Sequence, residues 1–262
     1  MTLSNPSLSG TEAHEALQVV KEECRTVSRK LTELERFRRS VREMNTLDGG
    51  RSTGTQASDG GGVRAVTSTR STGCVCGDVV DAFDGSLNRC EDTSLERAMS
   101  GELGKEIAST ILQDRSSKLS SGLKGAILHS VDERRSQLRV LEKALEKEKR
   151  SVSETVKLLE SINESLVTEG SLIDLGFDEL RQRHGTLIYL REDCEDRIQE
   201  RQQTLSETTK EAAVAGLRHM SLIEYLYEGL EVEHPVLSTL TEAIRVCEEN
   251  EMEVRKHICK VV

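Results

Sequence analysis

The chain has 262 residues, of which 35% are hydrophobic, 31% are charged and only 2% are aromatic, with no Trp. Its core must therefore be thin and aliphatic, and two prolines in so charged a chain favour long solvated helices over a sheet. The formal net charge of −10 and the pI near 5.3 argue against nucleic acid or an anionic membrane as a general partner, because both would repel the average surface.

The N-terminal segment 1–10 lacks the basic and apolar regions of a secretory signal. No uncharged apolar run approaches the roughly 20 residues that a membrane helix needs. We therefore expect a disordered N-terminus in a cytoplasmic protein that has no membrane segment. The seven cysteines mostly occupy apolar positions of the predicted helices, where a small hydrophobic residue would serve, so we expect reduced thiols.

The first predicted helix covers residues 11–44. Its apolar residues follow one another in steps of three or four, as a helix seam requires: Ala13, Leu17, Val20, Cys24, Val27, Leu31 and Leu34. The steps from Leu31 to Leu34 and from Leu34 to Phe37 are both of three residues, which shifts the apolar stripe around the helix. Gly, Ser and Thr dominate residues 45–73, so little burial could offset the entropy of ordering them, and we expect a flexible linker.

Residues 76–114 regain apolar periodicity in pieces, first around Val79, Val80 and Phe83 and then over 103–112. Glycines interrupt the pattern between these pieces. The segment therefore predicts two short helices that pack on the longer ones.

The strongest signal in the chain is a series of apolar residues spaced seven apart: Val131, Leu138, Leu145, Val152, Leu159 and Leu166. It predicts a helix from about 120 to 167, and the companion seam from Ile127 to Ile162 is half polar. A second long helix is predicted over 177–229, and its own seven-step series adds four residues to the structural seam: Phe177, Ile198, Leu205 and Ala212. Together the two helices predict an all-α protein built on a long antiparallel coiled-coil hairpin.

A single register of this hairpin pairs 166 with 177, 145 with 198, 138 with 205 and 131 with 212. It brings Leu141 close to Arg201. Glu148 falls near Cys194 and within reach of Arg191, with which it could form a register-specifying pair. Pro235 ends the second arm and begins a last helix, because Pro is tolerated in a first helical turn only. The hairpin domain is therefore predicted to span 76–262.

Four segments resemble a haloarchaeal family of uncharacterised proteins, a helical domain of unknown function. They are VVDAF at 79–83, ELGKEIA at 102–108, ERQQTL at 200–205 and YLYEGLEVEHPVL at 225–237. The resemblance implies a salt-adapted archaeal cytoplasm, and it supplies no activity, cofactor or catalytic residue. The excess of carboxylates over basic residues is also reminiscent of proteins from salt-rich cytoplasm.

Cysteines offer the main candidate for a metal site. Cys74 and Cys76 flank one residue and Cys90 follows, and thiolates are good ligands for zinc. No second Cys or His pair completes the set, so we expect no metal, with zinc at these cysteines as the alternative. The chain contains no nucleophile elbow, phosphate loop or paired zinc histidines, and we expect neither a catalytic residue nor a cofactor.

Four arginines surround Phe37 near the end of the first helix: Arg36, Arg38, Arg39 and Arg42. Guanidinium groups suit phosphate contacts, but acidic residues lie nearby and a solvated helix face is the simpler interpretation. Our leading hypothesis is a non-enzymatic interaction or scaffold protein that binds a protein partner or itself, with no small-molecule substrate. The alternative is a regulator that contacts nucleic acid through Arg36 to Arg42.

Overall fold

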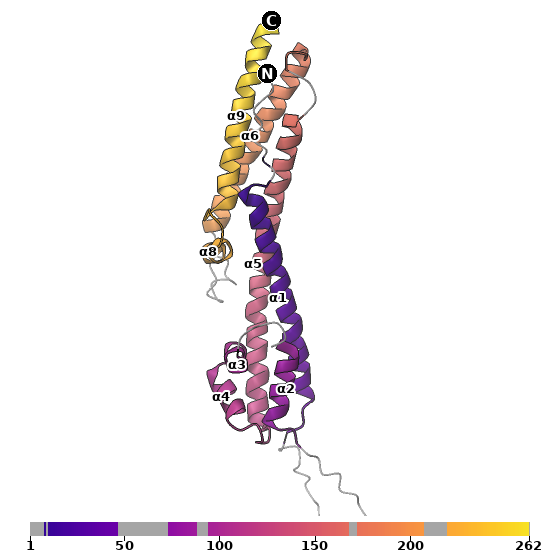
Figure 1. Cartoon of the computed structure of the whole chain (residues 1–262), viewed down its shortest axis with the longest axis vertical. Coiled ribbons are helices and arrows are strands. Elements are labelled where there is room, and N and C mark those ends of the chain that lie inside the picture. Colours follow the sequence, from indigo (N-terminus) through magenta and orange to yellow (C-terminus); the bar gives the residue numbers. More distant parts are fainter. Residues whose placement is uncertain are drawn as a thin grey trace, which may run out of the picture. The chain divides into compact units, whose positions relative to one another are not determined.

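A computed structural model describes residues 8, 10–46, 73–87, 94–167, 172–206 and 219–261. Over these residues the regular structure is helical apart from one isolated bridge between Val75 and Lys118, which confirms the all-α prediction. The helices of Figure 1 are α1 (Glu12–Glu43), α2 (Cys76–Leu87), α3 (Leu95–Leu103), α4 (Lys105–Gln113), α5 (Ser121–Val167), α6 (Phe177–Ser206), α8 (His219–Tyr227) and α9 (Pro235–Val261). The predicted linker falls largely on 47–72, outside the described residues.

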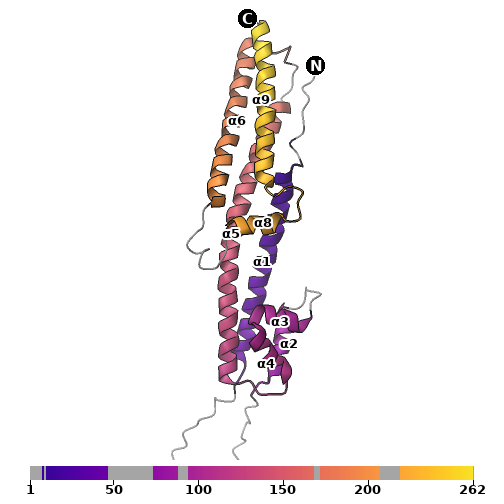
Figure 2. The same cartoon turned by 90° about the vertical axis from the view of Figure 1, so that its left-hand side faces the viewer.

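Two of the predicted helical segments need correction. The segment 76–114 holds three short helices rather than two, because Gly104 adopts a positive φ of 90° and separates α3 from α4. The second arm predicted over 177–229 is not described as one helix either. α6 is described to Ser206, and α8 is a separate helix that lies below the lower end of α9 in Figure 2, with its axis roughly perpendicular to that of α9.

The chain divides into two compact units, which are described separately. Unit 1 comprises residues 1–26 and 140–262, and unit 2 comprises residues 27–139. The helices α1 and α5 contribute residues to both units, whereas the short helices α2, α3 and α4 belong to unit 2.

In unit 1, α6 lies alongside α9 and runs antiparallel to the C-terminal part of α5 (Figures 1 and 2). The first turn of α1 is held by Thr239 of α9, whose hydroxyl accepts a hydrogen bond from the Ala13 N–H and donates one to Glu12, both at 3.2 Å. Leu8, within the segment expected to be disordered, is buried, and its N–H donates to Asn163 at 3.2 Å. Residues 1–7 and 9 lie outside the described residues.

The predicted seam agrees with the structure on α5 and differs from it on α6. All six seam residues of α5 are buried, from Val131 to Leu166. On α6 the buried seven-step series is instead Leu180, Leu187, Cys194 and Arg201. Phe177 is 43% exposed, and Ile198 and Leu205 are half-buried, while Ala212 lies outside the described residues.

Glu148 of α5 is a buried carboxylate without solvent exposure, and it links α5 to α6 in one register. Arg201 donates two hydrogen bonds to it, at 2.5 and 2.7 Å, and the Tyr227 hydroxyl of α8 donates a third at 2.5 Å. The prediction that Glu148 lies near Cys194 is therefore wrong, and its partner is Arg201, seven residues further along α6. The physical reason is that a buried carboxylate requires a cation and hydrogen-bond donors. Arg191 pairs instead with Glu251 of α9 at 3.0 Å and with Glu195.

Burial raises the pKa of the Tyr227 hydroxyl well above its ordinary value, and the adjacent Glu148 carboxylate raises it further. The phenol therefore stays protonated and remains a hydrogen-bond donor to Glu148 throughout the neutral range. The three groups form one network that joins α5, α6 and α8 inside unit 1.

Removing Glu148 tests this network. We expect Glu148→Ala to lower the free energy of unfolding by about 3 to 5 kcal/mol, because it leaves the Arg201 guanidinium buried and unpaired. The matched control is Glu146→Ala, which removes an exposed pair with Lys149 at 3.1 Å and is expected to cost less than about 1 kcal/mol. Chemical denaturation followed by circular dichroism measures both. Equal losses in the two variants would contradict the proposed role of Glu148.

Candidate anion-binding groove

In unit 2, the C-terminal part of α1 is anchored by Phe37. This ring is fully buried and packs edge-to-face on Phe83 of α2, with centroids 5.4 Å apart and an interplanar angle of 85°. Leu34 is buried on the same face of α1. Helical geometry then turns Arg36 and Arg39 away from the core, and both are exposed.

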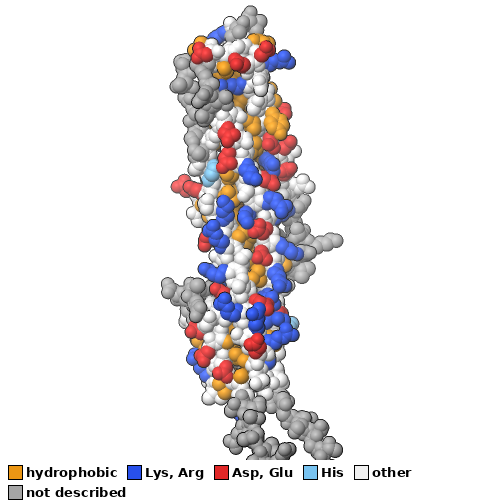
Figure 3. All heavy atoms as spheres, turned by 90° about the vertical axis from the view of Figure 1, so that its right-hand side faces the viewer, with side chains coloured by type: hydrophobic (Ala, Val, Ile, Leu, Met, Phe, Trp, Pro, Cys, Tyr) orange, Lys and Arg blue, Asp and Glu red, His pale blue; other side chains and the backbone are white. Residues whose placement is uncertain are grey.

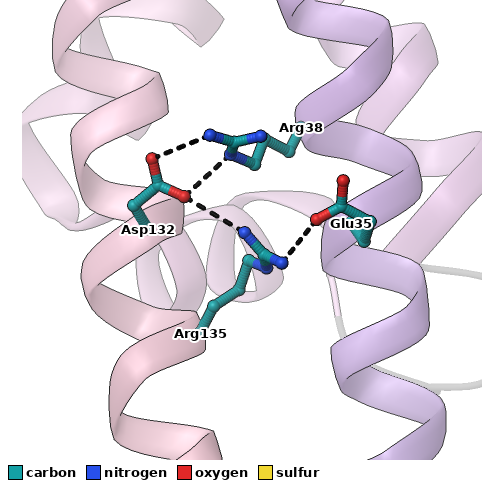
Figure 4. Close-up of polar contacts among 4 residues, drawn as sticks. All are labelled: Glu35, Arg38, Asp132 and Arg135. Atoms are coloured by element: carbon teal, nitrogen blue, oxygen red, sulfur yellow. Dashed lines mark hydrogen bonds and ion pairs between the residues drawn. The ribbon is translucent and has the colours of Figure 1, made fainter.

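A chain of ion pairs connects α1 to the N-terminal part of α5 (Figure 4). Arg38 forms two hydrogen bonds with Asp132, at 2.7 and 3.3 Å. Arg135 donates to Asp132 at 3.2 Å and approaches Glu35 of α1 at 2.5 Å. Each helix thus contributes one arginine and one carboxylate. The hydrogen bond from Arg38 is the main cause that lowers the pKa of Asp132, so this carboxylate remains charged at neutral pH.

Beside these ion pairs lies an open groove of about 500 Å³. It is lined by Leu31, Thr32, Glu35, Arg36 and Arg39 of α1 and by Arg135 and Arg139 of α5. Within the part of the chain that the structure describes, Arg36, Arg39 and Arg139 form no ion pair, whereas Arg135 is held by two carboxylates. Figure 3 shows Lys and Arg side chains gathered along the face where this part of α1 lies.

The electrostatics of the groove oppose those of the whole chain. Four arginines and one glutamate line it, which leaves three net positive charges in a protein whose net charge is −10. Guanidinium groups are weakly hydrated and bind carboxylates or phosphates through paired N–H donors. The arrangement can therefore attract and bind an anionic group.

The structure separates the four arginines that the sequence grouped together. Arg36 and Arg39 line the groove, while Arg38 is engaged by Asp132. Arg42 is exposed outside the groove lining, and its backbone carbonyl accepts a hydrogen bond from Lys124 at 2.8 Å. Only two of the four arginines therefore line the groove, and the four do not form one basic surface.

Sequence reasoning missed the contribution of α5. Arg135 and Arg139 are four residues apart and so share one helix face, which the spacing alone could show. Nothing in the sequence indicates that this face lies opposite Arg36 and Arg39, since that depends on how α1 and α5 pack in unit 2.

The cysteines near the start of α2 do not form a metal centre that the structure describes. Cys76 is buried, and this burial raises the pKa of its thiol, while Cys74 is half-buried in the preceding segment. Cys90 lies outside the described residues. Among the residues that are described, no three His, Cys, Asp or Glu side chains are grouped so that they could hold a metal ion.

No helix among the described residues combines the length and apolarity needed to cross a membrane.

The fold and the groove define an all-α protein that carries an arginine-lined groove. The chain belongs to the family described as Domain of unknown function (DUF7260), which matches residues 11–251. This match confirms the domain of unknown function in the resemblance drawn from the four sequence segments. Comparison with curated proteins finds no match, and neither does comparison with solved structures.

The contribution of Asp132 to stability should depend on pH. Its pKa is lowered in the folded protein, so its stabilising effect is present above the ordinary pKa of about 4 and is lost as the pH falls through the lowered value. We expect Asp132→Asn to be less stable than the wild type at pH 7, and the difference in urea midpoint to shrink in acid. Asp81→Asn on α2 is the control and should change the midpoint little at either pH. A difference for Asp132→Asn that stays constant down to acid pH would contradict the role of the pair.

Proposed function

We propose that this protein is a non-enzymatic helical interaction protein of coiled-coil type, and that its arginine groove binds an acidic segment of a partner protein. The observation that carries the proposal is the set of three arginines, Arg36, Arg39 and Arg139, that line one groove without an acidic partner among the described residues. Exposed guanidinium groups without a carboxylate partner, on a surface held by internal ion pairs, are suited to recognition rather than to catalysis.

The shape and lining of the groove favour a peptide. Its volume of about 500 Å³ lies in the range of about 300 to 1,000 Å³ that is typical of ligand sites. Leu31 and the Thr32 methyl group add apolar surface between the arginines, which can receive an aliphatic side chain next to a carboxylate. The ion pairs of Arg135 hold one side of the groove in place, which reduces the entropy that binding must remove.

Nucleic acid is the second candidate, and the same arginines support it because guanidinium groups also bind phosphates. Of the four arginines at positions 36 to 42, however, Arg38 is engaged by Asp132. The net charge of −10 would also repel a long polyanion beyond the groove, whereas a short acidic segment meets mainly the local positive charge.

The cellular setting belongs to the same proposal. Lys and Arg number 36 against 46 Asp and Glu, an acidic balance that supports a salt-rich cytoplasm, as does the resemblance to haloarchaeal proteins. In concentrated salt, exposed charge pairs are screened within about 3 Å at 1 M. Recognition there would rely on close guanidinium contacts and apolar burial, and the groove offers both.

Charge reversal in the groove tests the proposal. We expect a fluorescent peptide of alternating Glu and Leu to bind the full chain, and the double variant Arg36→Glu with Arg39→Glu to bind it at least about tenfold more weakly. Fluorescence anisotropy measures the affinity, with duplex DNA as a second probe over a range of salt concentrations. DNA binding that is stronger than peptide binding and is lost in the same variant would support the nucleic-acid candidate instead.

The matched control carries the same charge change on the same helix. Arg29→Glu with Arg42→Glu alters two exposed arginines of α1 that lie outside the groove lining, and it should keep the wild-type peptide affinity. Equal weakening in both double variants would show that only the net charge matters. That result, or the absence of peptide binding at low salt, would reject the groove as a recognition site.

A further inference from the structure

The loop between α8 and α9 carries three exposed glutamates, Glu228, Glu231 and Glu233. Two aliphatic side chains, Leu230 and Val232, lie between them and are only half-buried. Among the residues that the structure describes, none of the three carboxylates forms an ion pair. This segment from Glu228 to Glu233, here called the acidic loop, therefore presents three negative charges together with apolar surface.

Both ends of the acidic loop are held by buried residues. Tyr227, which precedes it, is buried and donates a hydrogen bond from its hydroxyl to Glu148. Pro235 and Val236, at the start of α9, are buried as well. Within the loop, the Leu230 N–H donates a hydrogen bond to the Tyr227 carbonyl at 2.9 Å. Fixed ends and a turn between them reduce the entropy that binding must remove.

The carboxylates of the following helix, α9, differ because basic residues already pair with several of them. Glu249 pairs with Arg245, and Glu253 pairs with Lys256 at 3.1 Å. The negative charge of α9 is thus partly offset within the helix, whereas that of the acidic loop is not. Of these two acidic segments, the loop is the one suited to a basic partner surface.

The arginine groove of unit 2 complements the acidic loop in charge and in polarity. Its lining carries three net positive charges, as many as the loop has negative ones. Leu31 and the Thr32 methyl group lie among the arginines, and Leu230 and Val232 lie among the glutamates. Each surface therefore offers charged groups for ion pairs and apolar groups for burial against the other.

We infer that the acidic loop of one copy of this chain binds in the arginine groove of a second copy. The inference rests on the proposed function, because it uses the same groove and names the partner as another molecule of this protein. The loop belongs to unit 1 and the groove to unit 2, so each copy has one of each. Two copies can close into a symmetric dimer with two such contacts, and larger assemblies form if the contacts do not close.

Charge reversal of the two surfaces tests the inference on the full chain. The loop variant carries Glu228→Lys, Glu231→Lys and Glu233→Lys, and the groove variant carries Arg36→Glu and Arg39→Glu. Sedimentation velocity over a concentration series should show that the wild type associates and that each variant alone associates at least about tenfold more weakly. An equimolar mixture of the two variants should regain association, because the glutamates of the groove variant meet the intact groove of the loop variant.

The matched control reverses three exposed carboxylates of α6 and α9 that lie outside the acidic loop. It carries Glu192→Lys, Asp196→Lys and Glu248→Lys, and it should associate as the wild type does. Association that survives reversal of the loop, or that the control weakens equally, would overturn the inference. So would a mixture that fails to associate although circular dichroism shows that both variants are folded.

The acidic peptide of alternating Glu and Leu separates failure of this inference from failure of the proposed function. A wild type that stays monomeric while the peptide binds its groove would overturn the inference and leave the proposed function intact. If the wild type stays monomeric and the peptide does not bind either, both are rejected.

Discussion

The carboxylate of Glu148 has no contact with solvent, and the arrangement of unit 1 follows from its need for partners. An isolated buried carboxylate is costly by several kcal/mol, so the helices around it must supply a cation and hydrogen-bond donors. Arg201 of α6 supplies the cation, and Tyr227 of α8 supplies a further donor. A shift of α6 by one heptad would place Glu148 opposite Cys194 and leave two buried charges unpaired. The observed register avoids this cost.

The arginines of the two units illustrate opposite uses of the same side chain. Arg201 in unit 1 is buried and paired with Glu148 through two hydrogen bonds, and it specifies structure. Arg36 and Arg39 in unit 2 are exposed and have no acidic partner among the described residues. Arg38 and Arg135 combine the two roles, since their ion pairs join α1 to α5 and also support one side of the groove. The proposed recognition site therefore uses exposed cations that have no acidic partner among the described residues.

Several features of the site have a partial signal in the sequence. The two successive steps of three residues around Leu34 predict that the apolar stripe turns around α1. In the structure Leu34 and Phe37 are buried, whereas Leu31 is only half-buried and lines the groove. The pair Arg135 and Arg139 is visible as one helix face. Which face meets α1 is not visible, because side chains from distant parts of the chain come together only through packing. The same reason explains why Phe177 was assigned to the seam and Arg201 was not.

The sequence by itself determined the helical class, the bounds of α1 and α5 to within a residue or so, and the apolar stripe of α5. These features are local, because helical periodicity and sparse prolines act over one or two turns. Only the tertiary structure decided the register of α6, the burial of the Glu148 network and the meeting of α1 and α5 arginines in one groove. Heptad spacing permits several registers of similar apolar burial, and the choice among them depends on pairing a few charges that are far apart in the chain.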